Sequence, residues 1–178
     1  TLKDIVRPFV YRKYLDFGAI SALTDLHAKI RAATKQKALT GLKNGTNVKL
    51  GRGGIREIEF IVQTFQVIRG GRNPKIRERS TLKALDVIAK EGLMEPAKVE
   101  QLKQAYVFLR NLEHAIQYVD DQQTQLLPDN PEQKAKIAAM MGFAPGVLEE
   151  QLKDANNFVA DSFDAIFQTK SDETADPW

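Results

Sequence analysis

The chain has 178 residues, of which 43% are hydrophobic and 28% are charged, close to the averages for soluble globular domains, which excludes disordered and fibrous proteins. It contains no cysteine, which excludes disulfides, thiolate metal sites and cysteine nucleophiles and suits a reducing cytoplasm, the location that we expect. No stretch approaches the roughly 20 apolar residues of a membrane span, and the first four residues show no signal-peptide pattern, so no membrane partner is expected.

The net charge of +3 conceals a separation between the two halves of the chain. Residues 1–83 contain 18 Lys and Arg against 6 Asp and Glu, whereas residues 84–178 contain 8 against 17. A basic half beside an acidic half favours a surface for phosphate or for an acidic partner. The alternative is that the charges lie on solvated helix faces and segregate without a function.

The periodicity of apolar residues is helical from the start of the chain. It predicts a helix over about residues 2–14 and a second helix from an N-cap at Asp16 to about Ile30. Residues 35–54 interrupt the pattern with five glycines among lysines and arginines, and predict a basic, mobile loop. A third helix is predicted from about Ile55 to Arg69, ended by two glycines.

The second half of the chain predicts four more helices. Ser80 caps a helix that ends near Gly92, and the longest helix runs over about residues 96–123. Asn130 caps a helix to about residue 141, and Pro145 opens the last one. The pattern therefore predicts an all-α bundle of about seven amphipathic helices, with one domain over residues 1–170 and a frayed tail over residues 171–178.

The stretch from Lys49 to Phe60, KLGRGGIREIEF, is the most unusual in the sequence. Glycines at a helix start allow backbone N–H groups to approach an anion, and lysine and arginine add donors suited to phosphate. The spacing matches neither a P-loop nor a dinucleotide fingerprint. The candidates for binding a nucleotide or phosphate are Lys49, Arg52, Gly53, Gly54 and Arg56. The alternative is a flexible loop that precedes an ordinary helix.

Glu113 falls on the apolar stripe of the longest predicted helix, so its burial would require a cationic partner such as Arg56 or Arg110. Glu59 can pair with Arg56 or with Gln63 on its own helix. We therefore interpret Glu59, Arg110 and Glu113 as candidates for structural ion pairs. Neither histidine belongs to a metal-ligand spacing, and no catalytic residue or metal site is predicted.

Four blocks in order resemble the glutamine synthetase adenylyltransferase family. They are RPFVYRKYLDF at residues 7–17, KLGRGGIREIEFIVQTFQVIRGGRNP at 49–74, AYVFLRNLE at 105–113 and DQQTQLLP at 121–128. The resemblance covers about residues 5–128. Enzymes of this family have two similar halves, one that attaches AMP to a tyrosine of glutamine synthetase and one that removes it by phosphorolysis. The motif REIEF followed by IRGGR is more similar to the adenylyl-removing half at the amino terminus.

The resemblance implies that this chain is the helical region after a nucleotidyltransferase core, and that the core and its metal-binding aspartates precede Thr1. The parent enzyme would use Mg²⁺ and a nucleotide or phosphate, whereas this fragment alone would be inactive. The implied partners are glutamine synthetase, PII signal proteins and the upstream core. The resemblance also strengthens the expectation that Lys49 to Arg56 contacts phosphate or AMP.

A second hypothesis is a stand-alone helical module that binds an acidic protein or a nucleic acid through its basic half. Clustered Lys and Arg support it, but the sequence has no helix-turn-helix signature and few aromatic residues among the positive charges. Nucleic acid is therefore not the partner that we expect.

Overall fold

The computed structural model describes residues 25, 28–29, 46–120, 124–144 and 146–172. The two helices predicted before residue 31 lie outside these residues except at positions 25, 28 and 29, which are helical and exposed. The part of the predicted loop before residue 46 also lies outside them.

The described residues form five α-helices and one short 3-10 helix, and none of them lies in a strand. The all-α class is therefore confirmed for the described part of the chain. The predicted number of about seven is not, because only five α-helices lie there. The elements are α3 (Ile55–Arg69), η1 (Pro74–Ile76), α4 (Thr81–Lys90), α5 (Pro96–Asp120), α6 (Pro131–Met140) and α7 (Val147–Asp172).

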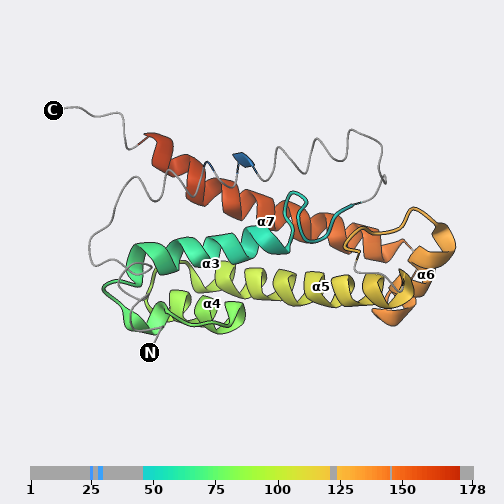
Figure 1. The fold of residues 1–178 in the computed structure, drawn as a ribbon, viewed down its shortest axis with the longest axis horizontal. Helices are drawn as coiled ribbons and strands as arrows, with labels where there is room; N and C mark the ends of the chain where they lie inside the picture. The colour runs from blue at the N-terminus through green and yellow to red at the C-terminus, as the bar shows by residue number, and fades with distance from the viewer. Residues whose placement is uncertain (1–24, 26–27, 30–45, 121–123, 145, 173–178) are drawn as a thin grey trace.

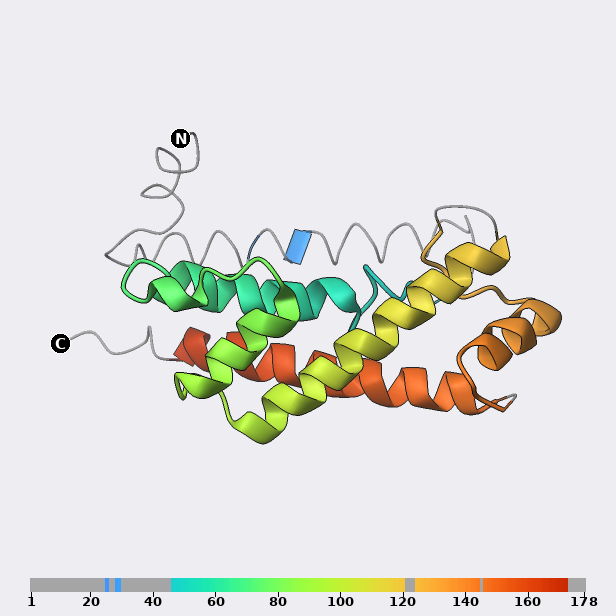
Figure 2. The ribbon, with the colours of Figure 1, turned by 90° about the horizontal axis from the view of Figure 1, so that it is seen from below.

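The long helix α5 is central to the arrangement, because it contacts the other four described α-helices. Helices α3 and α7 lie side by side, and α5 crosses them obliquely (Figures 1 and 2). The shorter helices α4 and α6 pack against opposite ends of α5 (Figure 1).

Local chemistry explains where several helices begin. The Ser80 hydroxyl accepts a hydrogen bond from the Lys83 N–H at 3.5 Å, and the Asn130 side chain accepts from the N–H groups of Glu132 and Gln133 at 2.8 and 3.2 Å. Both predicted N-caps are thus confirmed. Helix α7 continues to Asp172, so the first two residues of the predicted frayed tail are helical.

A single apolar core joins the five helices. Many of its buried side chains lie on apolar stripes that recur at helical spacing, whereas Val48 and Ile76 are fully buried outside the predicted helices. Phe60 of α3 packs against Phe163 and Phe167 of α7, with ring centroids 5.9 and 5.5 Å apart. The largest fully buried side chains are Ile55, Ile58, Ile61, Ile76, Leu85, Ile88, Leu102, Leu109, Leu112, Ile116, Ile137 and Leu148.

Residues 46–54, here called the glycine loop, are held by backbone hydrogen bonds to residues 125–127. Asn47 and Leu126 form an antiparallel bridge, in which the Val48 N–H donates to the Gln125 carbonyl at 2.9 Å. The Val48 side chain is fully buried. The predicted loop is therefore confirmed for residues 46–54, but tertiary backbone bonds and a buried valine hold it in place, which its composition did not indicate.

Candidate functional site

The glycine loop is wound tightly by one asparagine. The Asn47 side-chain oxygen accepts hydrogen bonds from the N–H groups of Lys49 and Leu50 at 3.0 and 2.7 Å, and its carbonyl accepts from Gly51 at 3.0 Å. Such a bond from an asparagine side chain to the backbone two residues later defines an Asx-turn. The turn fixes the direction in which the Lys49 side chain leaves the loop.

The backbone N–H groups at the start of α3 are already bonded within the protein. Gly53 donates to the Glu57 carboxylate at 2.9 Å, Ile55 donates to the Val48 carbonyl and Arg56 to the Lys49 carbonyl, both at 3.1 Å. Glu57 is buried and places its own negative charge at the positive end of the helix dipole. An anion at this loop would therefore be held by side chains, not by the predicted backbone donors.

Gly53 and Gly54 have a packing reason to be glycine. Gly53 has φ of +71°, and a Cβ there would lie 1.9 Å from the Asn156 carbonyl oxygen of α7. A Cβ on Gly54 would lie 2.7 Å from the Lys49 carbonyl oxygen. Both glycines thus allow the loop to approach α7 and to close on itself.

The cationic side chains of the loop diverge towards different helices. Arg52 reaches α7, where its Nη2 lies 2.9 Å from Oδ2 of Asp164. Lys49 reaches α5, where its Nζ lies 3.2 Å from Oε1 of Glu113. The predicted phosphate-binding residues are therefore close in sequence, but the structure divides them between two sides of the loop.

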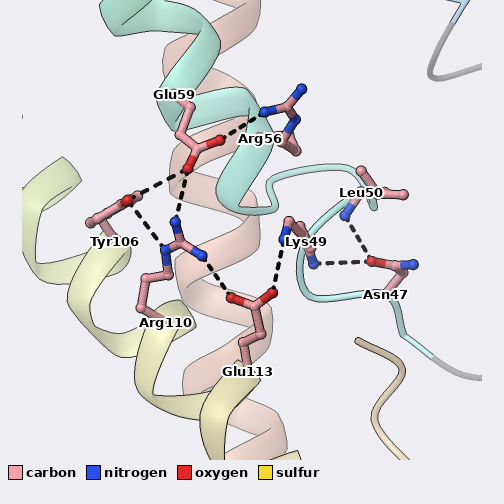
Figure 3. A network of polar contacts seen from close by, with 8 residues as sticks. All are labelled: Asn47, Lys49, Leu50, Arg56, Glu59, Tyr106, Arg110 and Glu113. Carbon is pink, nitrogen blue, oxygen red and sulfur yellow. Dashed lines mark hydrogen bonds and ion pairs between the residues drawn. The ribbon is translucent and has the colours of Figure 1, made fainter. Parts of the chain in front are cut away.

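Five charged side chains form one continuous network between the glycine loop, α3 and α5 (Figure 3). Arg110 of α5 occupies the middle, with Nη1 2.8 Å from Glu113 and Nη2 3.2 Å from Glu59. Glu59 also pairs with Arg56, whose Nη1 lies 3.1 Å from its Oε2, and Glu113 also pairs with Lys49. The charges alternate, and both ends of the network are cationic.

Tyr106 fixes the central arginine. Its hydroxyl accepts a hydrogen bond from Arg110 Nε at 3.2 Å and donates to Glu59 at 3.5 Å (Figure 3). The Arg110 guanidinium carbon also lies 5.4 Å from the centre of the tyrosine ring, within the range of a cation–π contact. Arg110 therefore has a defined position although its side chain is 34% exposed.

Burial and charge act in opposite directions on Glu113, whose side chain is only 3% exposed. Burial alone would raise the pKa of its carboxyl, but hydrogen bonds from Arg110 and Lys49 outweigh burial and hold the pKa below its ordinary value of 4.5. For Arg110, burial would lower the pKa, but Tyr106 and the two carboxylates raise it above its ordinary value. Both groups are thus charged at neutral pH.

The structure brings Glu59, Arg110 and Glu113, the candidates for ion pairs, into contact with one another through Arg110. Of the two partners considered for Glu113, Arg110 is the one in contact, whereas Arg56 pairs with Glu59. Sequence reasoning missed Lys49 as a second partner of Glu113, because 64 residues separate them. It also missed Tyr106, although its position four residues before Arg110 on one helix face was an available signal.

Other residues singled out in the sequence lie away from this network. His114 is exposed on α5, and His27 lies outside the described residues. Within the described ranges, no group of three or more His, Asp or Glu side chains could hold a metal ion. No helix in those ranges is long and apolar enough to cross a membrane.

Comparison with known families defines the class of this all-α chain. The family model described as GlnD PII-uridylyltransferase matches residues 24–169. This range includes the glycine loop and all the described helices except the last three residues of α7. The chain belongs to this family.

Several curated relatives that match the chain carry the name bifunctional glutamine synthetase adenylyltransferase/adenylyl-removing enzyme. The relative from Chromobacterium violaceum is 48% identical over 98% of this chain, and that from Ralstonia nicotianae is 46% identical over 96%. The relative from Bordetella pertussis is 46% identical over 94%. The resemblance predicted from the sequence blocks is thus confirmed. The chain spans about a fifth of the length of these relatives, 18–19% in each.

Proposed function

We propose that the chain is a non-catalytic helical segment of a glutamine synthetase adenylyltransferase, and that it supports the half that removes AMP from glutamine synthetase. Identity of 44–48% to relatives of that name over nearly the whole chain supports the parent activity. The REIEF and IRGGR motifs support assignment to the adenylyl-removing half. A nucleotidyltransferase core elsewhere in the polypeptide would supply the carboxylates that bind Mg²⁺.

In this proposal the reaction is phosphorolysis of the bond between AMP and a tyrosine. An oxygen of inorganic phosphate forms a new bond to the AMP phosphorus, and the bond from that phosphorus to the tyrosine oxygen breaks. The products are ADP and the tyrosine hydroxyl, which takes up a proton. Two negatively charged reactants approach each other, so fixed cations near the reacting groups would lower the barrier.

The observation that carries the proposed role is the cluster of cations at the start of α3. Lys49 and Arg52 lie in the glycine loop, and Arg56 lies in the first turn of α3. Each of the three side chains is at least 30% exposed. We propose that these side chains contact the phosphate group of AMP or the attacking inorganic phosphate. PII signal proteins and glutamine synthetase are the proposed partners of the parent enzyme, in the cytoplasm.

The test uses the complete enzyme that contains this chain, with adenylylated glutamine synthetase and inorganic phosphate as substrates. Release of ADP would be measured for the wild type and for Arg56→Ala and Arg52→Ala. We expect slower release in the Arg56 variant by a factor of about 10–100, the effect of losing one charged hydrogen bond in the transition state. Unchanged rates in both variants would leave these arginines with a structural role only.

One observation favours the alternative of an interaction module. The end of α3 and its connection to α4 carry four exposed basic side chains, Arg69, Arg72, Lys75 and Arg79. Such a surface fits an acidic partner. Binding of DNA or RNA that falls steeply with salt would support this alternative, whereas phosphate-dependent ADP release supports the first proposal.

A further inference from the structure

We propose that Lys49, Arg56 and Arg110 together form a binding site for one phosphate-type oxyanion, and that Glu59 and Glu113 are positioning residues that hold the three cations. This inference rests on the proposed function and deepens it, because it adds a residue of α5 to the site and separates Arg52 from it. The site draws on the glycine loop with the adjoining start of α3, and on α5, which is distant from both in sequence and meets them at the network (Figure 3).

The charge of the network is the first argument. Three cations are paired with two carboxylates, which leaves a net charge of +1 among these side chains. The carboxylates are the inner members, with 3% and 15% of their side chains exposed, whereas the cations are 30%, 34% and 51% exposed. The arrangement therefore presents positive charge to solvent and keeps the negative charge inside.

The donors of the cations are the second argument. A lysine ammonium has three N–H groups and an arginine guanidinium has five. In the hydrogen bonds of the described residues, Lys49 uses Nζ for Glu113 alone, and Arg56 uses Nη1 for Glu59 alone. Arg110 donates from all three of its nitrogens but retains a second N–H on each Nη. These cations can therefore bind an oxyanion without releasing their carboxylates, and forked donors match its oxygens.

The burial of Glu113 is the third argument. A buried ion pair gives little net stability, and apolar residues of similar volume in its place are often as stable or more stable. Glu113 lies on the same stripe as the fully buried Leu109 and Ile116, where a leucine would suit the core. A carboxylate at this position does what a leucine cannot, since it fixes Lys49 of the loop and Arg110 of α5 at 3.2 and 2.8 Å.

Arg52 does not share this geometry. It pairs with Asp164 of α7 and, within the described part of the chain, bonds to no member of the network. Among the predicted phosphate-binding residues, Lys49 and Arg56 therefore belong to the oxyanion site, whereas Arg52 belongs to the contact between the loop and α7.

The test measures the phosphate dependence of ADP release by the complete enzyme. We expect Arg56→Gln and Arg110→Gln each to raise the KM for inorganic phosphate about tenfold or more, since each removes charged hydrogen bonds to the anion. Arg56→Gln is the variant that preserves the fold, because Arg56 is half-exposed and pairs only with Glu59 among the described residues. Arg56→Lys should recover part of the loss. Lys103→Gln is the matched control, a cation of α5 that pairs with Asp86 and Glu100 instead.

The positioning role has its own readout. Glu113→Gln should raise the KM for phosphate through Lys49 and Arg110 while leaving the KM for adenylylated glutamine synthetase within a factor of two. A change in kcat alone, or an unchanged KM for phosphate in both Arg56→Gln and Arg110→Gln, would overturn the inference. Absence of ADP release from the wild type would instead refute the proposed function. Calorimetric titration of the complete enzyme with inorganic phosphate then tests the site by itself, with weaker binding expected in both arginine variants and equal binding overturning it.

Discussion

The Glu113 carboxylate accepts a hydrogen bond from the Lys49 ammonium at 3.2 Å, although the two residues are 64 positions apart in the sequence. Lys49 belongs to the glycine loop and Glu113 to α5, so this contact ties the loop to the face of α5. The same carboxylate holds Arg110 at 2.8 Å. A single buried group thus determines the mutual position of two cations, and several measurable properties of the protein depend on it.

Replacement of Glu113 by alanine should destabilise the protein by about 3 kcal/mol, the lower end of the cost of breaking a buried ion pair, because its partners are one-third exposed and can be hydrated. Chemical denaturation monitored by circular dichroism would give the free energy of unfolding. Glu100→Ala on the same helix is the control, since Glu100 is exposed and its partners among the described residues are Lys103 and Gln104 of its own helix. Equal stability of the two variants would contradict the buried pair.

The pH dependence of stability follows from the same carboxylate. The pKa of Glu113 in the folded protein lies below 4.5, its ordinary value in an unfolded chain. Its contribution to the free energy of unfolding is therefore complete above about pH 4.5 and is lost as the pH falls through the lower folded pKa. The stability difference between wild type and Glu113→Gln, measured by denaturation from pH 7 to pH 2.5, should shrink towards acid. A difference that grows towards acid would contradict the direction of the shift.

Gly53→Ala should be among the most damaging small substitutions in the chain. The new Cβ would lie 1.9 Å from the Asn156 carbonyl oxygen, and the backbone has φ of +71°. We expect a loss of about 3 kcal/mol or more, since a backbone clash adds to the cost of the left-handed conformation.

Gly92→Ala separates these two causes, because Gly92 has φ of +67° but nothing within 4 Å of its Cβ position. It should cost only about 1–2 kcal/mol, the conformational term alone. Thermal denaturation of both variants would measure the difference. Equal melting temperatures would show that the close approach of the loop to α7 is not rigid.

Arg52→Ala should affect stability little. The ion pair with Asp164 has a 56% exposed arginine, and exposed pairs contribute about 0–1 kcal/mol. In a double-mutant cycle with Asp164→Ala, the double variant should differ from the sum of the two single variants by less than about 1 kcal/mol. A larger coupling energy in this double-mutant cycle would mean that the pair holds the loop against α7 more strongly than its exposure indicates.

The helices were predictable from the sequence because their apolar residues recur at helical spacing and because Ser80 and Asn130 supply local caps. The order of the glycine loop was not predictable, since it depends on the bridge between Asn47 and Leu126, 79 positions later in the chain. Composition alone suggested mobility there. Contacts of this range leave no periodic signal.

The candidate site divides in the same way. Burial of Glu113 followed from its place on the apolar stripe, and Arg110 followed from helical spacing. The contacts of Lys49 with Glu113 and of Glu57 with Gly53 did not follow. The sequence suggested a loop with open backbone donors, whereas Glu57 already occupies one of them with its own carboxylate. Only the folded positions of side chains show which donors stay available to a ligand.

The most direct test of the proposed function compares the two opposing reactions of the complete enzyme in a Lys49→Gln variant. Two rates would be measured for the variant and for the wild type. One is release of ADP from adenylylated glutamine synthetase, and the other is attachment of AMP to unmodified glutamine synthetase. If this chain serves the adenylyl-removing half, removal should slow about tenfold or more and attachment should keep at least half of its rate. Slower attachment with normal removal would contradict the assignment.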